Sequence, residues 1–325
     1  MTCVRLLIHS LSLSDGSRTL IPTTAQLLRT QSFLDGRSDF ATGPAYRTTL
    51  PQAFTETPSA APDRYIFHVG FCGSTLLSRL LDQAGRSLVL REPNCLADLA
   101  NQANQPAHDR KVALDRGLAE LRSSLRKRWQ EGEAVVVKPS NWVNRLLPAF
   151  VAQTTPMRAL FLTMDRAAFV RAIVRGGPDR LQFIARATLH FSNADAAFPP
   201  LVAEALACEG EGPAKLLALA ATAHELQVRL MRRAAAHWTN SLTLTFTELS
   251  VDPIATARRA AAALNLDFDE KQVAHDCHHW AGQHAKAPEE PYARETEISE
   301  TDAMPCDMKT LVENVLTWAA AKFGD

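Results

Sequence analysis

The sequence lacks net charge, because its 35 Lys and Arg residues are balanced by 35 Asp and Glu residues. A balanced chain has no overall field that draws it onto a polyanion, so nucleic acid is not an expected partner. The sequence also lacks any run near the roughly 18 consecutive apolar residues that a membrane helix needs. No membrane partner is therefore expected, and only a local basic cluster is left to bind a small anion.

Cysteine is sparse, and its spacing lacks the pattern of a metal or redox motif. Six cysteines are scattered over 325 residues without a Cys-x-x-Cys pair. Such cysteines are typical of reduced thiols in a cytoplasmic protein. The apolar patch at the N-terminus is broken by Arg5, His9 and Ser10, which makes it a poor signal peptide. A cytoplasmic location is the expectation.

The composition, 46% hydrophobic and 22% charged, is that of a globular protein. Residues 1–63 combine short apolar runs with a stretch rich in Pro, Thr and Ala, which predicts an N-terminal extension and a connector. A main domain is expected over residues 64–325. The sequence carries no signal for an oligomeric state.

Short apolar runs alternate with helix-like segments through the main domain. Runs that are apolar throughout indicate strands buried on both faces, and their alternation with helices predicts an α/β fold with a doubly wound parallel sheet of about five strands. Ligands in such folds bind at the carboxyl ends of the strands. The expected strands are residues 64–69, 87–90, 134–137, 158–163 and 241–246.

The segment "GFCGSTLL" after the first of these strands has the outline of a loop that cradles phosphate. Gly70 and Gly73 allow the backbone amides to converge, and Ser74 and Thr75 add hydroxyl donors in the first turn of the following helix. No Lys follows Gly73, so the full Walker pattern is not met. The other interpretation of this segment is a tight turn with a capping residue.

The same loop resembles the 5′-phosphosulfate loop of the sulfotransferases, x-[KR]-x-G-[ST]-T-x-L, at Gly73, Ser74, Thr75 and Leu77. Residues 246–267, "FTELSVDPIATARRAAAALNLD", are similar to the family's Y-E-D-L-x-x-D-P element and its helix. The likeness covers about residues 64–295 and is closest to bacterial sulfotransferase-like proteins. It implies a P-loop-type fold and 3′-phosphoadenosine 5′-phosphosulfate (PAPS) as donor. The loop residues that it implies as donor-binding are Gly70, Phe71, Cys72, Gly73, Ser74, Thr75 and Leu76.

Three positions depart from the family pattern. Phe71 stands where the loop cation is expected, and Met164 and Ala172 stand where an Arg and a Ser clamp the 3′-phosphate. Lys138, at the end of the third strand, is the expected source of the missing loop charge. Replacement of the clamp is expected from an arginine group after the fourth strand, with Arg166 the nearest to the strand end: Arg166, Arg171 and Arg175.

Glu92 follows the second strand at the same sheet edge and is the expected general base, with Lys138 as its catalytic partner. Arg91 beside it is expected to hold substrate or to pair with Glu92. Residues 275–300 resemble the family's C-terminal lid loop, with His284, Lys286 and Arg294 as candidate donor contacts. The cluster His275–His284 also contains metal-capable residue types, but adjacent ligands rarely turn to one ion, and no metal is expected.

These observations favour transfer of a sulfuryl group from PAPS to a hydroxyl or amine of a small molecule or glycan. A second hypothesis is a phosphotransferase or NTPase that uses ATP or GTP, with Asp165 as a magnesium ligand. A third is a non-catalytic protein that keeps the nucleotide-binding fold, and the substitutions at Phe71, Met164 and Ala172 favour it.

Overall fold

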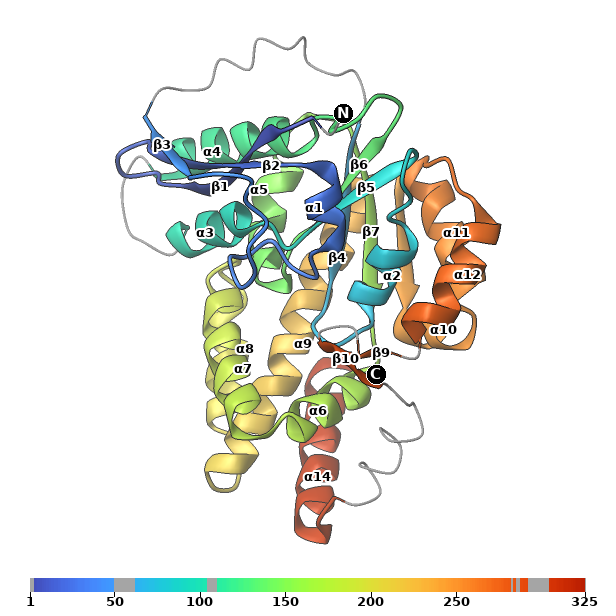
Figure 1. The fold of residues 1–325 in the computed structure, drawn as a ribbon. Coiled ribbons are helices and arrows are strands. Elements are labelled where there is room, and N and C mark those ends of the chain that lie inside the picture. The colour runs from blue at the N-terminus through green and yellow to red at the C-terminus, as the bar shows by residue number, and fades with distance from the viewer. Residues whose placement is uncertain are drawn as a thin grey trace.

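A computed structural model describes residues 3–49, 62–103, 110–281, 283–284, 287–291 and 304–324. Its centre is a five-stranded parallel sheet (Figure 1). Each strand lies within one residue of its predicted bounds, so the predicted α/β class is confirmed. The strands are β4 (Asp63–His68), β5 (Ser87–Arg91), β6 (Ala134–Lys138), β7 (Met157–Thr163) and β8 (Ser241–Thr245).

Helices cover both faces of this sheet. Every residue of β5 is buried, as is every residue of β6 after Ala134, which is why these runs are apolar throughout. The first face is covered by α2 (Ser74–Leu80), α11 (Pro253–Leu264) and α12 (Glu270–Ala281), and the second by η1 (Asn141–Leu146), α5 (Leu147–Val151) and α9 (Gly212–His237). A short helix, α10 (Phe246–Val251), joins β8 to α11.

The strand order is β5-β6-β4-β7-β8, which puts β4 in the middle of the sheet. After β4 the chain runs to β5 on one side, and after β7 it runs to β8 on the other. Neighbouring strands whose connections leave in opposite directions form a crevice at their carboxyl ends, where ligands of doubly wound sheets bind. This crevice lies between the loop that starts at Val69 and the turn at Met164.

The N-terminal residues form a structure that the uneven sequence pattern did not predict. Three antiparallel strands pair in the order β1-β2-β3, and a short helix, α1, lies between β2 and β3 in the chain. Strand β1 packs on α3 and α4 (Figure 1). The elements are β1 (Arg5–Leu11), β2 (Arg18–Thr23), α1 (Ala25–Thr30), β3 (Tyr46–Thr48), α3 (Asn94–Gln102) and α4 (Arg110–Leu125).

A buried charge cluster fastens this N-terminal part to the central sheet. Arg29 of α1 pairs with Asp82 and Glu133, and Asp82 also pairs with Arg91 at the end of β5. Arg91 further donates to the Gln31 carbonyl at 2.8 Å. Because buried charges are tolerated only with partners, these contacts fix where α1 sits against β5.

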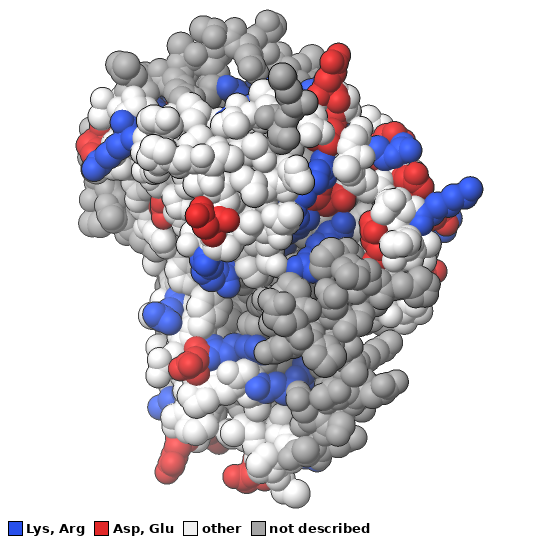
Figure 2. All heavy atoms as spheres, in the orientation of Figure 1, with Lys and Arg blue, Asp and Glu red and all other residues white. Residues whose placement is uncertain are grey.

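The remaining helices lie below the sheet in Figure 1. They are α6 (Arg166–Arg175), α7 (Gly177–Ser192), α8 (Pro199–Leu206) and α14 (Cys306–Phe323), and a hairpin of β9 (Gln283–His284) and β10 (Ala287–Pro291) lies near them. Acidic and basic side chains are interspersed over the face shown in Figure 2. Within the described residues, no helix combines the length and the apolar content needed to cross a bilayer.

Candidate functional site

The loop between β4 and α2 contains two residues with left-handed backbone, Phe71 at φ 65° and Gly73 at φ 75°. A Cβ on Gly73 would lie 3.0 Å from Leu249 and 3.3 Å from Phe246, so glycine is required there for space as well as for conformation. Phe71 has no such freedom, and a left-handed L-residue costs on the order of 1–2 kcal/mol. Backbone strain of this kind persists where the surroundings enforce it, often at functional sites.

The side chains of the loop differ in whether they can form a hydrogen bond with a ligand. The Thr75 hydroxyl makes no hydrogen bond with the described residues, although the side chain is largely buried. Cys72 is fully buried, its Sγ lies 2.9 Å from the Val69 carbonyl, and burial raises the pKa of its thiol to about 12. Cys72 therefore stays protonated, and only its backbone can contact an anion. Leu76 packs against the core.

Glu92 and Lys138 meet at the predicted edge. Arg91 and Lys138 are register partners on β5 and β6, and the Lys138 Nζ lies 2.5 Å from Glu92 Oε1. The Lys138 side chain is 1% exposed, whereas that of Glu92 is 15% exposed. Glu92 has φ 53° and donates its N–H to the Lys138 carbonyl at 2.6 Å. The structure thus brings the two predicted catalytic residues together on a strained backbone.

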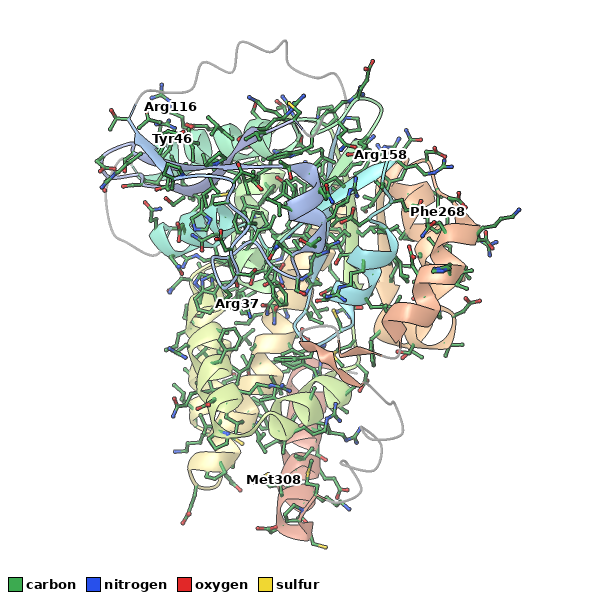
Figure 3. All side chains as sticks on the ribbon, viewed as in Figure 1. Arg37, Tyr46, Arg116, Arg158, Phe268 and Met308 are labelled. Atoms are coloured by element: carbon green, nitrogen blue, oxygen red, sulfur yellow. The ribbon has the colours of Figure 1, made fainter. Side chains whose placement is uncertain are left out.

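A second cation near Glu92 comes from the N-terminal part. The Arg37 guanidinium lies 3.9 Å from Glu92 Oε2 and 4.1 Å from the centre of the Phe33 ring. The Lys138 Nζ lies 5.8 Å from the same ring. Figure 3 marks Arg37 at the lower margin of the N-terminal part. Arg37 could not be predicted from the sequence, because its position depends on how the N-terminal part packs on the sheet.

His68, the last residue of β4, is buried between the loop and β6. Its Nδ1 lies 2.8 Å from the Val69 carbonyl and its Nε2 lies 3.0 Å from the Pro139 carbonyl. Burial, and then the charge of Lys138, lower its pKa to about 3. The charge of Lys138 also lowers the pKa of Cys72, against the larger effect of burial, so this cation acts on the loop electrostatically.

Ser140 and Asn141, which follow β6, also lie at this edge. The Ser140 hydroxyl accepts the Trp142 N–H and caps η1. The Asn141 side chain lies 3.4 Å from the position of a Cβ on Gly70 and donates to Gln227 at 3.2 Å. Asn141 therefore forms one wall of the loop.

Arg180 of α7 supplies a cation at the loop that sequence analysis missed. Its guanidinium lies 4.3 Å from the centre of the Phe71 ring and donates to the Ala172 carbonyl at 2.5 Å. These are two of the three positions that depart from the family pattern. Gly176 makes room for this arrangement, because a Cβ there would lie 1.9 Å from Arg180 Nε. Arg180 is eight residues from Ala172 in the sequence, and the turn between α6 and α7 brings the two together.

The arginines after β7 do not lie as expected. Arg166 pairs with Glu225 at 3.2 Å and donates to the Gly324 carbonyl at 2.8 Å, so it faces α9 and α14. Arg171 is half-buried and makes no ion pair with the described residues. Arg91 pairs with Asp82 and not with Glu92.

The predicted lid lies partly outside the described residues. This applies to Lys286 and Arg294, and to the side chains of His278, His279 and His284. His275 is exposed and Cys277 is buried. In the part of the chain that the structure describes, no three His, Cys, Asp or Glu side chains come together as a metal site requires.

No protein-family model matches the chain, and no curated protein matches it. We therefore infer the function from the geometry of the site and from the motif likeness of the loop.

Proposed function

We propose that this chain is a sulfotransferase-like enzyme on a P-loop-type fold, which transfers a sulfuryl group from PAPS to a hydroxyl or amine of a small molecule or glycan. One observation carries the proposal. Among the described residues, three that are not glycine have positive φ: Phe71, Glu92 and Asn265. Asn265 ends a helix, where this conformation is common. Phe71 and Glu92 follow β4 and β5 at the carboxyl edge, and β6 with Lys138 lies between these strands.

The residues at the loop fit the 5′-phosphosulfate end of PAPS. The backbone from Gly70 to Gly73, the start of α2 and the Thr75 hydroxyl supply donors. Lys138 and Arg180 supply positive charge on two sides of the loop. The fit to the 3′-phosphate is weaker, since Arg166 is held by Glu225. The proposal therefore assigns most of the donor affinity to the 5′ end.

Glu92 is the residue that takes the proton of the acceptor. Its ion pair with Lys138 favours the ionised carboxylate, which is the form that accepts a proton. PAPS, when bound, supplies the activated sulfuryl group. The buried ammonium of Lys138 stabilises negative charge that develops at the loop.

Calorimetric titration with 3′-phosphoadenosine 5′-phosphate (PAP), the sulfate-free product, tests the proposal. We expect one site with a dissociation constant in the micromolar range, independent of magnesium. Thr75→Val removes one hydroxyl with little change of shape and should weaken binding about tenfold. Thr222→Val is the matched control, because Thr222 is a buried threonine whose hydroxyl bonds to Ala218 inside α9.

Failure of the wild type to bind PAP would contradict the proposal. Binding of ATP only in the presence of magnesium would favour phosphoryl transfer on the same scaffold. Equal affinity of PAP for wild type and Thr75→Val would place the nucleotide away from the loop.

A further inference from the structure

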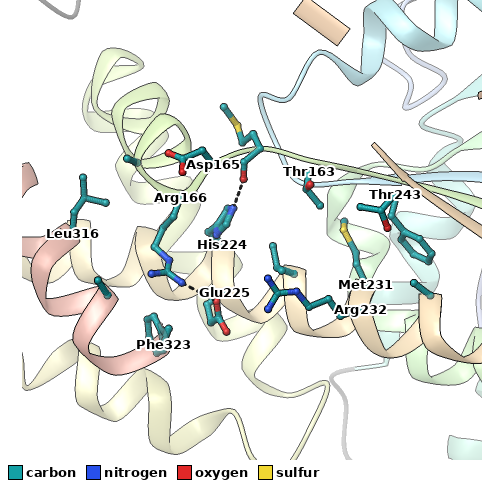
Figure 4. A pocket seen from close by; sticks show the side chains of 16 residues that line it. Thr163, Asp165, Arg166, His224, Glu225, Met231, Arg232, Thr243, Leu316 and Phe323 are labelled. Carbon is teal, nitrogen blue, oxygen red and sulfur yellow. Dashed lines mark hydrogen bonds and ion pairs between the residues drawn. The ribbon is translucent and has the colours of Figure 1, made fainter. Parts of the chain in front are cut away.

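A cavity of about 600 Å³ lies on the second face of the sheet, beside the carboxyl ends of β7 and β8 (Figure 4). This volume is in the range of small-molecule sites. Helices α6, α9 and α14 complete its walls. Much of the lining is apolar, from Phe161, Met164, Val228, Met231, Leu316 and Phe323.

One wall carries buried polar atoms that lack partners. His224 is 6% exposed, and its Nε2 lies 2.8 Å from the Met164 carbonyl, so Nε2 bears the hydrogen. The Nδ1 atom then presents a lone pair, and it has no hydrogen-bond partner among the described residues. The Nε of Arg166 is buried without a partner as well. Unsatisfied buried groups are costly, so this wall is less well satisfied than the apolar part of the lining.

The charged side chains around the cavity differ in whether they form ion pairs. Glu225 is held by Arg166 at 3.2 Å and by Arg229 at 2.6 Å. Asp165 accepts the Ala168 N–H as the N-cap of α6. Arg232 makes no ion pair with the described residues, and Figure 4 shows Arg166 and Arg232 on either side of Glu225. Arg232 is thus the cation of the lining without an ion pair among the described residues, whereas Arg166 is held by Glu225.

This cavity is separate from the loop after β4. The Phe169 ring stands between them, 6.2 Å from the Phe71 ring and 5.3 Å from the His224 ring. A ligand here contacts β7, α9 and α14 but none of the loop residues 70–76, and neither Lys138 nor Arg180; Arg166, which the sequence suggested for the 3′-phosphate, belongs to this cavity instead. The inference therefore does not rest on the proposed function.

We propose that the cavity binds a small amphipathic organic anion with one negative charge. Its carboxylate or sulfonate head lies at Arg232, the lining cation that makes no ion pair with the described residues. Its apolar body lies between α9 and α14, against Val228, Leu316 and Phe323. An apolar body with a single acid group matches both the lining and the charge.

Two naphthalene dyes separate the contributions of shape and charge: 8-anilinonaphthalene-1-sulfonate is anionic, and N-phenyl-1-naphthylamine is neutral. Both should bind the intact folded chain with increased fluorescence. Arg232→Gln should weaken the anionic dye about fivefold and leave the neutral dye unchanged. Arg233→Gln is the matched control, because Arg233 is the next residue of α9 and pairs with Asp195 outside the cavity.

Filling the cavity tests its location. Thr243→Trp enlarges an exposed residue of β8 on the lining and should weaken both dyes more than tenfold. Ala320→Trp fills the same space from α14, so dye affinity can still be measured in one filling variant if the other does not fold. Unchanged affinity of both dyes in a folded filling variant would overturn the proposal. So would equal loss of the anionic dye in Arg232→Gln and Arg233→Gln.

Discussion

Two buried ion pairs lie at opposite ends of the sheet and differ in their surroundings. At the amino end of β4, Asp63 is 0% exposed and Arg122 is 2% exposed. Arg122 also donates to Gln153 at 2.8 Å and to the Thr155 carbonyl at 3.2 Å. At the carboxyl edge, Glu92 is partly open to solvent and has left-handed backbone.

The difference separates a structural pair from the pair that we propose to be reactive. All three guanidinium nitrogens of Arg122 have acceptors, and the segment around it is regular helix. Such a pair contributes to the position of α4 and cannot reach a substrate. Glu92 combines a buried cation, partial exposure and strain, which together suit a carboxylate that exchanges a proton.

The largest expected effect is on catalysis. Glu92→Gln keeps the shape of the side chain but cannot take a proton, so we expect transfer from PAPS to fall by about 10²–10⁴-fold. The affinity for PAP should change less than about twofold, since the change removes no loop donor. The measurement is the transfer rate to the best acceptor from a panel of alcohols, phenols and amines. Activity near the wild-type value would exclude Glu92 as the base.

The next effect is on stability at the other end of the sheet. Arg122→Met leaves Asp63 buried, where burial already raises the pKa of the carboxyl despite two neighbouring arginines. We expect a loss of about 3–5 kcal/mol in the free energy of unfolding by urea. Arg258→Met is the control, because Arg258 and Glu270 form an exposed pair, worth less than about 1 kcal/mol. Similar losses in both variants would contradict the comparison.

The third prediction concerns pH. Burial lowers the pKa of His68 to about 3 and that of His190 to about 4. Below pH 6.5 the unfolded chain takes up protons that the folded chain does not, so the stability from these residues is present above 6.5 and is lost as the pH falls toward these values. The loss for His68 is on the order of a few kcal/mol.

This pH effect is measured as the slope of the unfolding free energy between about pH 6.5 and 4.5. His68→Gln should flatten the slope relative to wild type. His275→Gln should not, because the His275 side chain is 82% exposed. The raised pKa of Asp82 acts in the opposite direction, so each variant is compared with wild type. Parallel slopes for all three proteins would refute the assignment to His68.

The smallest effect concerns the cation at Phe71. Gly176→Ala places a methyl group where Arg180 Nε lies, and no backbone strain arises at φ −80°. Displacement of Arg180 should weaken PAP binding about threefold. Gly212→Ala is the control, since a Cβ there meets nothing within 4 Å. The same affinity in both variants would remove Arg180 from the site.

Much of the sheet and part of the site were predictable from the sequence. Apolar runs identified the five strands, and their carboxyl ends placed Glu92 and Lys138 at one edge before any contact was known. The strand order was not predictable, because runs such as 87–90 and 134–137 have the same apolar character and do not encode their neighbours.

The contacts that sequence reasoning missed or misassigned are long-range. Arg166 had the expected position after β7, but it pairs with Glu225 of α9 and donates to the Gly324 carbonyl at the end of α14, 158 residues away in the chain. Arg37 and Arg180 reach the site through the N-terminal part and the α6–α7 turn. Helical spacing predicts which residues share a face, but not which element packs against that face.

The most direct test of the central claim compares two variants that each remove a cation from a buried carboxylate. Lys138→Met acts at Glu92, and Arg126→Met acts at Asp63, where Arg122 remains. The account predicts that PAP binds wild type and Arg126→Met with the same affinity, and Lys138→Met at least about tenfold more weakly. Equal binding by both variants, or no binding by wild type, would contradict it.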